Sequence, residues 1–378
     1  MKKIVYISGS RSDYSPMRLT LMKLDKLVDL TVIATCMHLS PKFGLTVKEI
    51  EKDGLKIKKV YMFMDNKDSL EGMVESFSTG ILGTLRAIEE ISPNIIFLEG
   101  DRGESLAGAT VGAYLNTPIV HHGGGDRSGS IDNKIRNAIT MLADYHLAGN
   151  RYSYRQLLKM GIPKEKLFLV GEPGLDDVYS KDFCPKKEII KKYGINPKNP
   201  CILLIQHPNT NEYRDAGKQI KETLNAIKEL RIQTIGIYSN ADAGGRIINK
   251  TLEEYSKNSP FLKVYPHIER KEFLGLMNTC DLMVGNSSAG IVELPSFKKP
   301  FVCIGTREKR RLRAGNIIDV GYKKKEITDA INKALNNKEF KKRLEGIRNP
   351  YGDGKSSSRI VEIIFKIVEQ DKNFNQYL

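Results

Sequence analysis

The stretch Val284-Gly-Asn-Ser-Ser-Ala-Gly-Ile-Val-Glu293 follows the apolar run Asp281-Leu-Met-Val284 and enters a helix-like pattern. A strand that leads through a turn of small residues into a helix brings free backbone N–H groups and the positive end of a helix dipole to one point. The stretch therefore predicts an anion site, with phosphate as the usual occupant. A second strand–turn–helix, Ile4-Val-Tyr-Ile-Ser-Gly-Ser-Arg-Ser-Asp13, lies near the N-terminus. Two such turns, one in each half, indicate a nucleotide-type ligand between two α/β domains.

The composition is that of a folded, water-soluble protein. With 378 residues, two domains of ordinary size are expected. The hydrophobic content of 40% and the charged content of 28% argue against a disordered or fibrous protein. No apolar run reaches the roughly 20 residues that span a bilayer. The first strand-like run, of about five residues, is too short for the core of a signal peptide. We therefore expect a cytoplasmic protein with no membrane association.

The cysteines and the basic residues indicate no metal and no nucleic acid. The cysteines are odd in number and never closely spaced, so we expect reduced core residues; no metal, zinc included, and no cofactor is predicted. The net charge of +15 admits a nucleic-acid partner. However, the lysines are dispersed and are not interleaved with aromatic residues, which is typical of a solvated surface. A local arginine cluster differs, because guanidinium groups bind phosphate in a bidentate fashion. Its members are Arg307, Arg310, Arg311 and Arg313.

Short runs rich in Val and Ile alternate with longer mixed segments, which is typical of βαβ units and parallel sheets. The expected strands are Ile4–Ile7, Leu30–Ala34, Ile95–Leu98, Ile119–Val120, Tyr145–Ala148, Leu167–Val170, Ile202–Gln206, Thr234–Tyr238, Leu262–Val264, Leu282–Val284 and Phe301–Ile304. Helical patterns between them include Ser105–Leu115 and Lys218–Leu230. The sequence thus predicts an α/β protein with two Rossmann-like domains that face a cleft.

Pro, Gly, Asn and Lys concentrate near residues 173–200, where the strand-like alternation pauses. We therefore expect an N-terminal domain over residues 1–172, a linker region over 173–199 and a nucleotide-binding domain over 200–360. A C-terminal helix over 361–378 is expected to follow, since Ser358–Glu369 has an amphipathic pattern that could pack on either domain.

Three clusters with chemically active side chains follow expected strands: Leu98–Glu104, His121–Asp132 and Gln206–Thr210. In open α/β sheets, ligands lie beyond the carboxyl ends of the strands. The shared position of the clusters therefore favours an active site over a purely structural interpretation.

Each cluster also has a structural interpretation. Asp101 would be a helix N-cap, with Glu104 completing a capping box. Asp132 would cap a helix over Asn133–Leu142 in the same way. His207, which precedes a proline, would be a structural histidine, and the glycines at 123–125 would only permit a tight turn.

The sequence resembles the UDP-N-acetylglucosamine 2-epimerases over almost its whole length. It is most similar to the hydrolysing branch, which supplies N-acetylmannosamine-type sugars for sialic and legionaminic acid synthesis. The matching pieces are Gly9-Ser-Arg-Ser-Asp-Tyr-Ser15, Met37-His-Leu-Ser-Pro-Lys-Phe-Gly-Leu-Thr-Val-Lys-Glu49, Gly100-Asp-Arg102, Gly129-Ser-Ile-Asp132, Ile135-Arg136, Ala138-Ile-Thr140, His207-Pro208, Ser239-Asn-Ala-Asp-Ala-Gly-Gly245, Gly285-Asn-Ser-Ser288, Gly305-Thr-Arg307 and Tyr351-Gly-Asp-Gly354.

The resemblance implies a glycosyltransferase B-type architecture with a UDP-sugar in the cleft, and a homodimer or higher homo-oligomer. It places Arg11, Ser15 and Arg102 of the first domain against the nucleotide sugar. From the second domain it assigns UDP contacts to Asn240, Ser287, Ser288, Glu293, Arg307 and Arg311. It also puts His267 and Ile268 beside the uracil.

The implied reaction removes the proton at C2 with loss of UDP from C1, and then hydrates the resulting glycal on its other face. Such a route requires acid–base groups and a stabiliser for the leaving group. By resemblance, Asp101, Asp132 and His207 take the acid–base positions. Arg11 and the arginines of the second domain would stabilise the departing diphosphate without a metal.

Two positions depart from the family pattern. The family usually has His-Ile-Glu-Gly-Gly after the fourth strand, and its glutamate is a principal acid–base residue; here the segment is His121-His-Gly-Gly-Gly125. Gly123 stands in the place of the glutamate, so either His122 or Asp126 takes over its task, or the chemistry has changed. Arg310 also replaces a common glycine, which would add positive charge near the phosphates.

Four functions remain open on the sequence, the fourth being glycosyl transfer, since the fold alone does not fix the function. The first is hydrolytic C2 epimerisation of a UDP-2-acetamido sugar. The second keeps the fold but changes the reaction, to plain nucleotide-sugar hydrolysis or to epimerisation of a 2,4-diacetamido sugar. The third is binding of a nucleotide sugar with weak catalysis or none.

Overall fold

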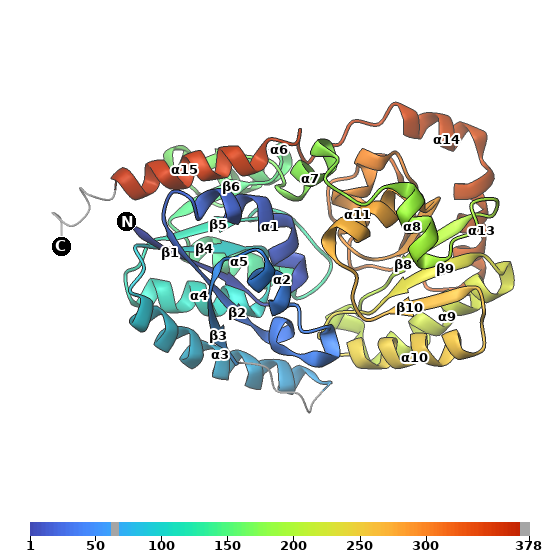
Figure 1. Cartoon of the computed structure of the whole chain (residues 1–378), viewed down its shortest axis with the longest axis horizontal. Coiled ribbons are helices and arrows are strands. Elements are labelled where there is room, and N and C mark those ends of the chain that lie inside the picture. Colours follow the sequence, from blue (N-terminus) through green and yellow to red (C-terminus); the bar gives the residue numbers. More distant parts are fainter. Residues whose placement is uncertain (62–67, 371–378) are drawn as a thin grey trace.

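The computed structural model of the chain, which describes residues 1–61 and 68–370, has two α/β lobes, each built on one parallel sheet (Figure 1). The first sheet contains β1 (Lys3–Ser8), β2 (Asp29–Thr35), β3 (Lys56–Val60), β4 (Ile95–Glu99), β5 (Ile119–His122), β6 (Tyr145–Ala148) and β7 (Leu167–Leu169). The second contains β8 (Cys201–Ile205), β9 (Gln233–Ile237), β10 (Leu262–Tyr265), β11 (Leu282–Gly285), β12 (Phe301–Ile304) and β13 (Ile317–Val320). The expected fold class is confirmed.

The strand order of each sheet determines where a ligand can bind. The first sheet runs β3-β2-β1-β4-β5-β6-β7 and the second runs β10-β9-β8-β11-β12-β13. In both sheets the order reverses once, between β1 and β4 and between β8 and β11. Crossovers leave a crevice at such a switch point, outside the carboxyl ends of the two strands. The residues that follow β1, β4, β8 and β11 are therefore the ones that the topology presents to a ligand.

Helices cover both faces of each sheet, as both sets of alternating residues in the strands are apolar. On β1, Ile4 and Tyr6 pack in one core cluster, and Val5 and Ile7 pack in another on the opposite face. The helices are α1 (Arg11–Leu24), α2 (Val47–Lys52), α3 (Leu70–Ile91), α4 (Gly103–Tyr114), α5 (Asp132–Leu142), α6 (Arg151–Lys159), α7 (Gly174–Ser180), α8 (Lys186–Tyr193), α9 (Ala216–Leu230), α10 (Gly245–Lys257), α11 (Arg270–Thr279), α12 (Ala289–Val292), α13 (Lys324–Asn336), α14 (Lys338–Glu345) and α15 (Ser356–Gln370).

The strands expected from the sequence are all present, with small shifts at their ends. The sequence did not predict β3 and β13, which lie at the edges of the two sheets. The sequence of β3 is Lys-Ile-Lys-Lys-Val, and most of its residues are exposed or half-buried. An edge strand contacts the core on few sides, so it lacks the continuous apolar run of a central parallel strand.

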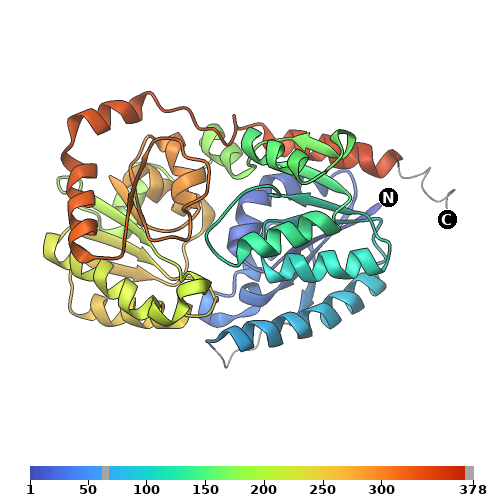
Figure 2. The same ribbon diagram turned by 180° about the vertical axis from the view of Figure 1, so that it is seen from behind.

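The C-terminal helix returns to the first lobe. After α14 on the second lobe, the chain crosses back and α15 lies against the lobe that contains β1 (Figures 1 and 2). The side chains of Ile360, Ile364 and Ile367 are buried in one cluster with Tyr6 of β1 and other core residues of the first lobe. This helix begins at Ser356 rather than at 361, and residues 371–378 of the expected helix lie outside the described residues.

The expected linker over residues 173–199 contains α7 and α8. Ile189 and Tyr193 of α8 are buried in the core of the second lobe. The carboxylate of Asp176 on α7 accepts hydrogen bonds from the backbone N–H groups of Ser356 (2.9 Å) and Ser357 (2.8 Å) at the start of α15. We therefore propose that the first domain comprises the first sheet together with α15, and that α8 belongs to the second domain. Within residues 1–61 and 68–370, no helix is both long and apolar enough to cross a bilayer.

Candidate active site

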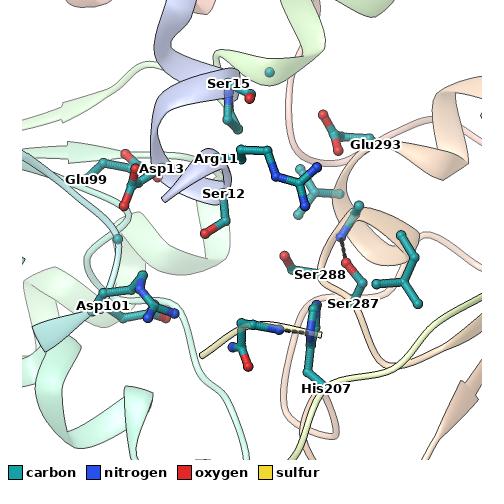
Figure 3. A pocket seen from close by; sticks show the side chains of 18 of the residues that line it. Arg11, Ser12, Asp13, Ser15, Glu99, Asp101, His207, Ser287, Ser288 and Glu293 are labelled. Atoms are coloured by element: carbon teal, nitrogen blue, oxygen red, sulfur yellow. Dashed lines mark hydrogen bonds between the residues drawn. The ribbon is translucent and has the colours of Figure 1, made fainter. Parts of the chain in front are cut away.

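One cavity of about 280 Å³ lies between the lobes, at the switch points of both sheets. Its size is at the lower end of the range for small-molecule sites. Arg11 extends from α1 towards the side that carries Ser287, Ser288 and Glu293, while Asp101 lies on the wall of the first lobe (Figure 3). Most of the site residues expected from the sequence line this cavity. They are Arg11, Ser15, Asp101, Arg102, Asp126, Asp132, His207, Asn240, Ile268, Ser287, Ser288, Glu293, Arg307 and Arg311.

Other expected residues lie elsewhere. His122 is completely buried behind the wall and does not line the cavity, so it cannot itself contact a ligand as expected. The neighbours of His267 line the cavity, but the His267 ring binds protein groups instead. It accepts a hydrogen bond from Arg11 (2.7 Å) and approaches Glu49 at 2.5 Å. Arg310 is exposed and does not line the cavity. The expectation that it adds positive charge near the phosphates is therefore wrong.

The turn after β11 connects the two strands of the second switch point. Asn286 accepts a hydrogen bond from the backbone N–H of His207 (2.6 Å) and donates one to the His207 carbonyl (2.9 Å). Arg307 donates to the Asn286 carbonyl at 3.1 Å. The small-residue turn thus fixes His207 and Arg307 in the cavity wall, as well as presenting Ser287 and Ser288.

The two predicted anion turns are weaker than expected from the sequence. Only four residues, Ala289–Val292, form α12 after the second turn, and so short a helix has a small dipole. At the first turn, the Asp13 carboxylate already accepts hydrogen bonds from the backbone N–H groups of Gly9 (3.1 Å) and Ser10 (3.2 Å). Burial raises the pKa of Asp13 to about 7. The positive charge in the cavity comes mainly from arginine side chains: Arg11, Arg102, Arg136, Arg270, Arg307 and Arg311.

The structural alternatives for the two aspartates are wrong. The N-cap of α4 is Arg102, with no side-chain capping bond, so Asp101 is not the cap. Instead Asp101 forms an ion pair with the buried Arg136. Asp132 lies inside the first turn of α5, where Ser130 donates to its carboxylate at 2.7 Å and Arg307 approaches it at 3.6 Å.

His207 is held in one tautomer at the cavity wall. The backbone N–H of Asn240 donates to its Nδ1 at 3.2 Å, so the proton of the neutral ring is on Nε2. Burial, together with the charges of Arg307, Arg102 and Arg11, holds the pKa of His207 well below its ordinary value. In the free protein His207 is therefore a neutral hydrogen-bond donor, and a bound anion beside these arginines would raise its pKa.

The sequence analysis missed two carboxylates of the cavity, Glu99 and Glu172, which form a cluster with His122. His122 Nδ1 lies 2.6 Å from the Glu99 carboxylate, and its Nε2 donates to the Gly171 carbonyl at 3.0 Å. Both carboxylates follow apolar strands, and Glu99 directly precedes the Gly-Asp-Arg piece. For Glu99, a charged residue at the end of a buried strand was the available signal, whereas β7 before Glu172 is only partly buried and gave none.

The same trio is the only group among the described residues close enough to hold a metal ion, with ligand atoms within 4.8 Å of one another. However, both nitrogens of His122 are engaged, one as a donor to a carbonyl and the other at a carboxylate. Burial lowers the pKa of His122, but the charges of Glu99 and Glu172 outweigh this effect and raise it to about 9. A protonated ring has no lone pair for a metal, so His122 in this state does not ligate one.

Glu172 makes the stability of the protein depend on pH. Burial raises its pKa to about 7, although the charge of His122 opposes this shift. The folded state then binds the proton more tightly than the unfolded chain, so this contribution is complete below about pH 4 and is lost as the pH rises through about 7. Glu172→Gln should therefore unfold at the wild-type temperature at about pH 4 and at a higher temperature at pH 8. Calorimetry at the two pH values is the measurement, and an equal shift at both would contradict the assignment.

Comparisons with known proteins identify the family of the chain. The family model described as UDP-N-acetylglucosamine 2-epimerase matches residues 22–365. The chain is 34% identical to the hydrolysing UDP-N,N'-diacetylbacillosamine 2-epimerase of Legionella pneumophila, over 96% of each protein. It is also 34% identical to the hydrolysing GDP/UDP-N,N'-diacetylbacillosamine 2-epimerase of Campylobacter jejuni, over 99% of this chain and 98% of that protein.

A solved structure shows the same fold. The UDP-GlcNAc 2-epimerase from Neisseria meningitidis, bound to UDP-GlcNAc, superposes with a TM-score of 0.82 at 20% identity, over 96% of this chain and all of that one. The likeness extends across both lobes, and the family match spans nearly the entire sequence. The chain therefore belongs to the UDP-N-acetylglucosamine 2-epimerase family.

Proposed function

We propose that the protein is a hydrolysing 2-epimerase that converts a UDP-2-acetamido sugar to the free sugar inverted at C2, and releases UDP. One observation supports this most directly: Asp101, Asp132 and His207 share a cavity with Ser287 and Arg307. Groups that move protons thus lie within one ligand of groups that bind a diphosphate. The arginines can neutralise the leaving group, so the proposed reaction needs no metal.

The chemistry divides between the two walls. The C2 proton passes to the Asp101 carboxylate, while the bond between C1 and the phosphate oxygen breaks and its electrons leave with UDP. Water then bonds to C1 of the glycal, loses its proton to a cavity carboxylate, and C2 receives a proton on the other face. We propose that Arg11, Arg307 and Arg311 bind the diphosphate, with Ser15, Arg102, Asn240, Ser287 and Ser288 as further contacts. We propose that Glu293 and Ile268 contact the nucleoside.

Binding of the diphosphate would also change the charges around the acid–base groups. In the structure Arg307 faces Asp132 and Arg311 pairs with Asp126 at 2.8 Å. A diphosphate between the lobes would attract both guanidinium groups. Asp132 would then be released for proton transfer at the moment when the leaving group becomes bound.

A 2,4-diacetamido sugar is a second candidate substrate, and one specific finding favours it. Both relatives at 34% identity have names that refer to diacetylbacillosamine. The residue at position 123 is a glycine that lines the cavity, so this part of the wall carries no side chain. We propose a UDP-2-acetamido sugar as the substrate class and treat the 4-acetamido group as the feature to test.

The test compares UDP-N-acetylglucosamine with UDP-N,N'-diacetylbacillosamine in deuterated water, with NMR of the products. We expect UDP release, inversion at C2 and deuterium at C2 for one of the two sugars, with the larger kcat/KM identifying the substrate. UDP release without deuterium at C2 would establish plain hydrolysis instead. Binding of both sugars with neither reaction would establish a nucleotide-sugar-binding protein.

A further inference from the structure

We propose that Glu99, oriented by His122, is the acid–base residue that returns a proton to the sugar at C2, in the space beside Gly123. This inference rests on the proposed function and adds a residue to its site. His122 is a positioning residue in this scheme, because it contacts Glu99 and does not reach the cavity.

The fold brings Glu99 to the reacting side of the cavity. It is the last residue of β4, at the switch point of the first sheet, two residues before Asp101. Its side chain is 15% exposed and lines the cavity, on the same wall as Asp101 (Figure 3). A carboxylate that is mostly buried but open to a ligand cavity can exchange a proton with that ligand.

Gly123 leaves the space that Glu99 uses. A Cβ atom at position 123 would lie 3.7 Å from Oε1 of Glu99 and 3.3 Å from the Cα of Gly100. The carboxylate from β4 therefore stands next to the point from which a side chain on the neighbouring strand would start. Position 123, just after β5, therefore carries no carboxylate, while the carboxylate of Glu99 at the end of β4 occupies the volume next to it.

His122 fixes the direction of this carboxylate. Glu99 and His122 are register partners on the parallel strands β4 and β5, and His122 is at Oε2 of Glu99. Among the described residues, no other side chain or backbone group has a hydrogen bond to this carboxylate. Oε1, the atom nearer to Gly123, is consequently available to a ligand. The bond from His122 to the Gly171 carbonyl holds the ring in place.

The partners of the two carboxylates suit them to different tasks. Asp101 pairs with Arg136, a guanidinium that does not give up its proton, so Asp101 remains an anion that can accept the proton from C2. Glu99 pairs with the imidazole of His122, whose pKa is raised to about 9 in this pair, and unlike a guanidinium this ring can pass a proton to the carboxylate. In the hydration step, the Glu99 acid donates its proton to C2 while the oxygen of water bonds to C1. The proton lost by that water passes to Asp132, and Glu99, which is open to the cavity, takes up a proton again from water that enters after the products leave.

The test uses Glu99→Gln, which keeps the length of the side chain but cannot donate an acidic proton. We expect product formation with deuterium at C2 to fall by about 10²–10⁴-fold, with UDP affinity unchanged. The matched control is Glu89→Gln, on the exposed surface of α3, which should behave as wild type. Wild-type turnover within about threefold in Glu99→Gln would overturn the proposal, since general acid catalysis contributes more than that.

Glu99→Asp separates a catalytic role from a structural one. An acid–base role predicts that Asp, which retains the carboxylate, is more active than Gln. A packing role predicts the reverse order, because Gln retains the shape. If Glu99→Gln does not show the thermal unfolding transition of the wild type, the turnover of Glu99→Asp is compared with that of Glu99→Asn. These two side chains have equal length, and only Asp retains a carboxylate. A wild type that is inactive on every sugar would refute the proposed function. If the wild type is active but Glu99→Gln turns over faster than Glu99→Asp, only the acid–base role of Glu99 is refuted.

Discussion

Asp101→Asn should lower turnover by about 10²–10⁴-fold while leaving the affinity for UDP within about threefold of the wild type. The amide has nearly the shape of the carboxylate but cannot accept the proton from C2. In the proposed binding mode UDP contacts arginines and hydroxyl groups of the cavity, and Asp101 is not among these contacts. Steady-state UDP release and calorimetric titration with UDP measure the two effects.

The stability of this variant needs its own control, because Asp101 is the ion-pair partner of the buried Arg136. An unpaired buried charge is destabilising, although an asparagine oxygen can still accept a hydrogen bond. The matched control is Asp329→Asn on the exposed surface of α13. Turnover by Asp101→Asn at more than a tenth of the wild-type rate would remove Asp101 from the catalytic residues, because proton transfer contributes about 10²-fold or more.

Gly285→Ala should destabilise the second domain by about 3 kcal/mol or more and abolish UDP binding at temperatures where the wild type is folded. Gly285 has a φ of +127°, and a Cβ at this position would lie 1.9 Å from the Ile205 carbonyl oxygen. Backbone atoms of β8 would have to move, and the turn that binds His207 would move with them. Thermal unfolding and UDP titration are the measurements.

Gly346→Ala is the matched control for this substitution. Its backbone has a φ of −84°, and a Cβ there would meet only the Arg343 carbonyl, at 3.8 Å. The same chemical change should therefore be neutral or stabilise the protein by a few tenths of a kcal/mol. Equal unfolding temperatures for the two variants would show that the turn after β11 is less constrained than the structure indicates.

Much of the fold could be predicted because central parallel strands are apolar along their whole length. Tyr145–Ala148 and Phe301–Ile304 have the bounds expected from the sequence. The edge strands β3 and β13 could not be found in this way, since their exposed sides allow lysine and aspartate. The sequence analysis did not predict how short α12 is, although Pro295, which disfavours a continuing helix, follows it closely and the chain continues as a short 3-10 helix.

The cavity lining could be predicted where residues lie within two positions of a strand end, as Asp101, His207 and Ser287 do. It was not predictable where a side chain acts through a neighbour. The sequence does not show that Asp13 occupies the N–H groups of its own turn, or that His122 points behind the wall. Glu99 belonged to the cluster Leu98–Glu104 that follows an expected strand, but nothing in the sequence singled it out within that cluster.

The sequence by itself determined the fold class, the family and the residue types that meet at the ends of the strands. It could do so because these depend on apolar runs and on short contiguous motifs. Only the tertiary structure decided which charges are paired, that both adjacent histidines, His121 and His122, are buried, and which carboxylate lies beside Gly123. Those properties depend on the register of neighbouring strands and on burial, which join residues far apart along the chain.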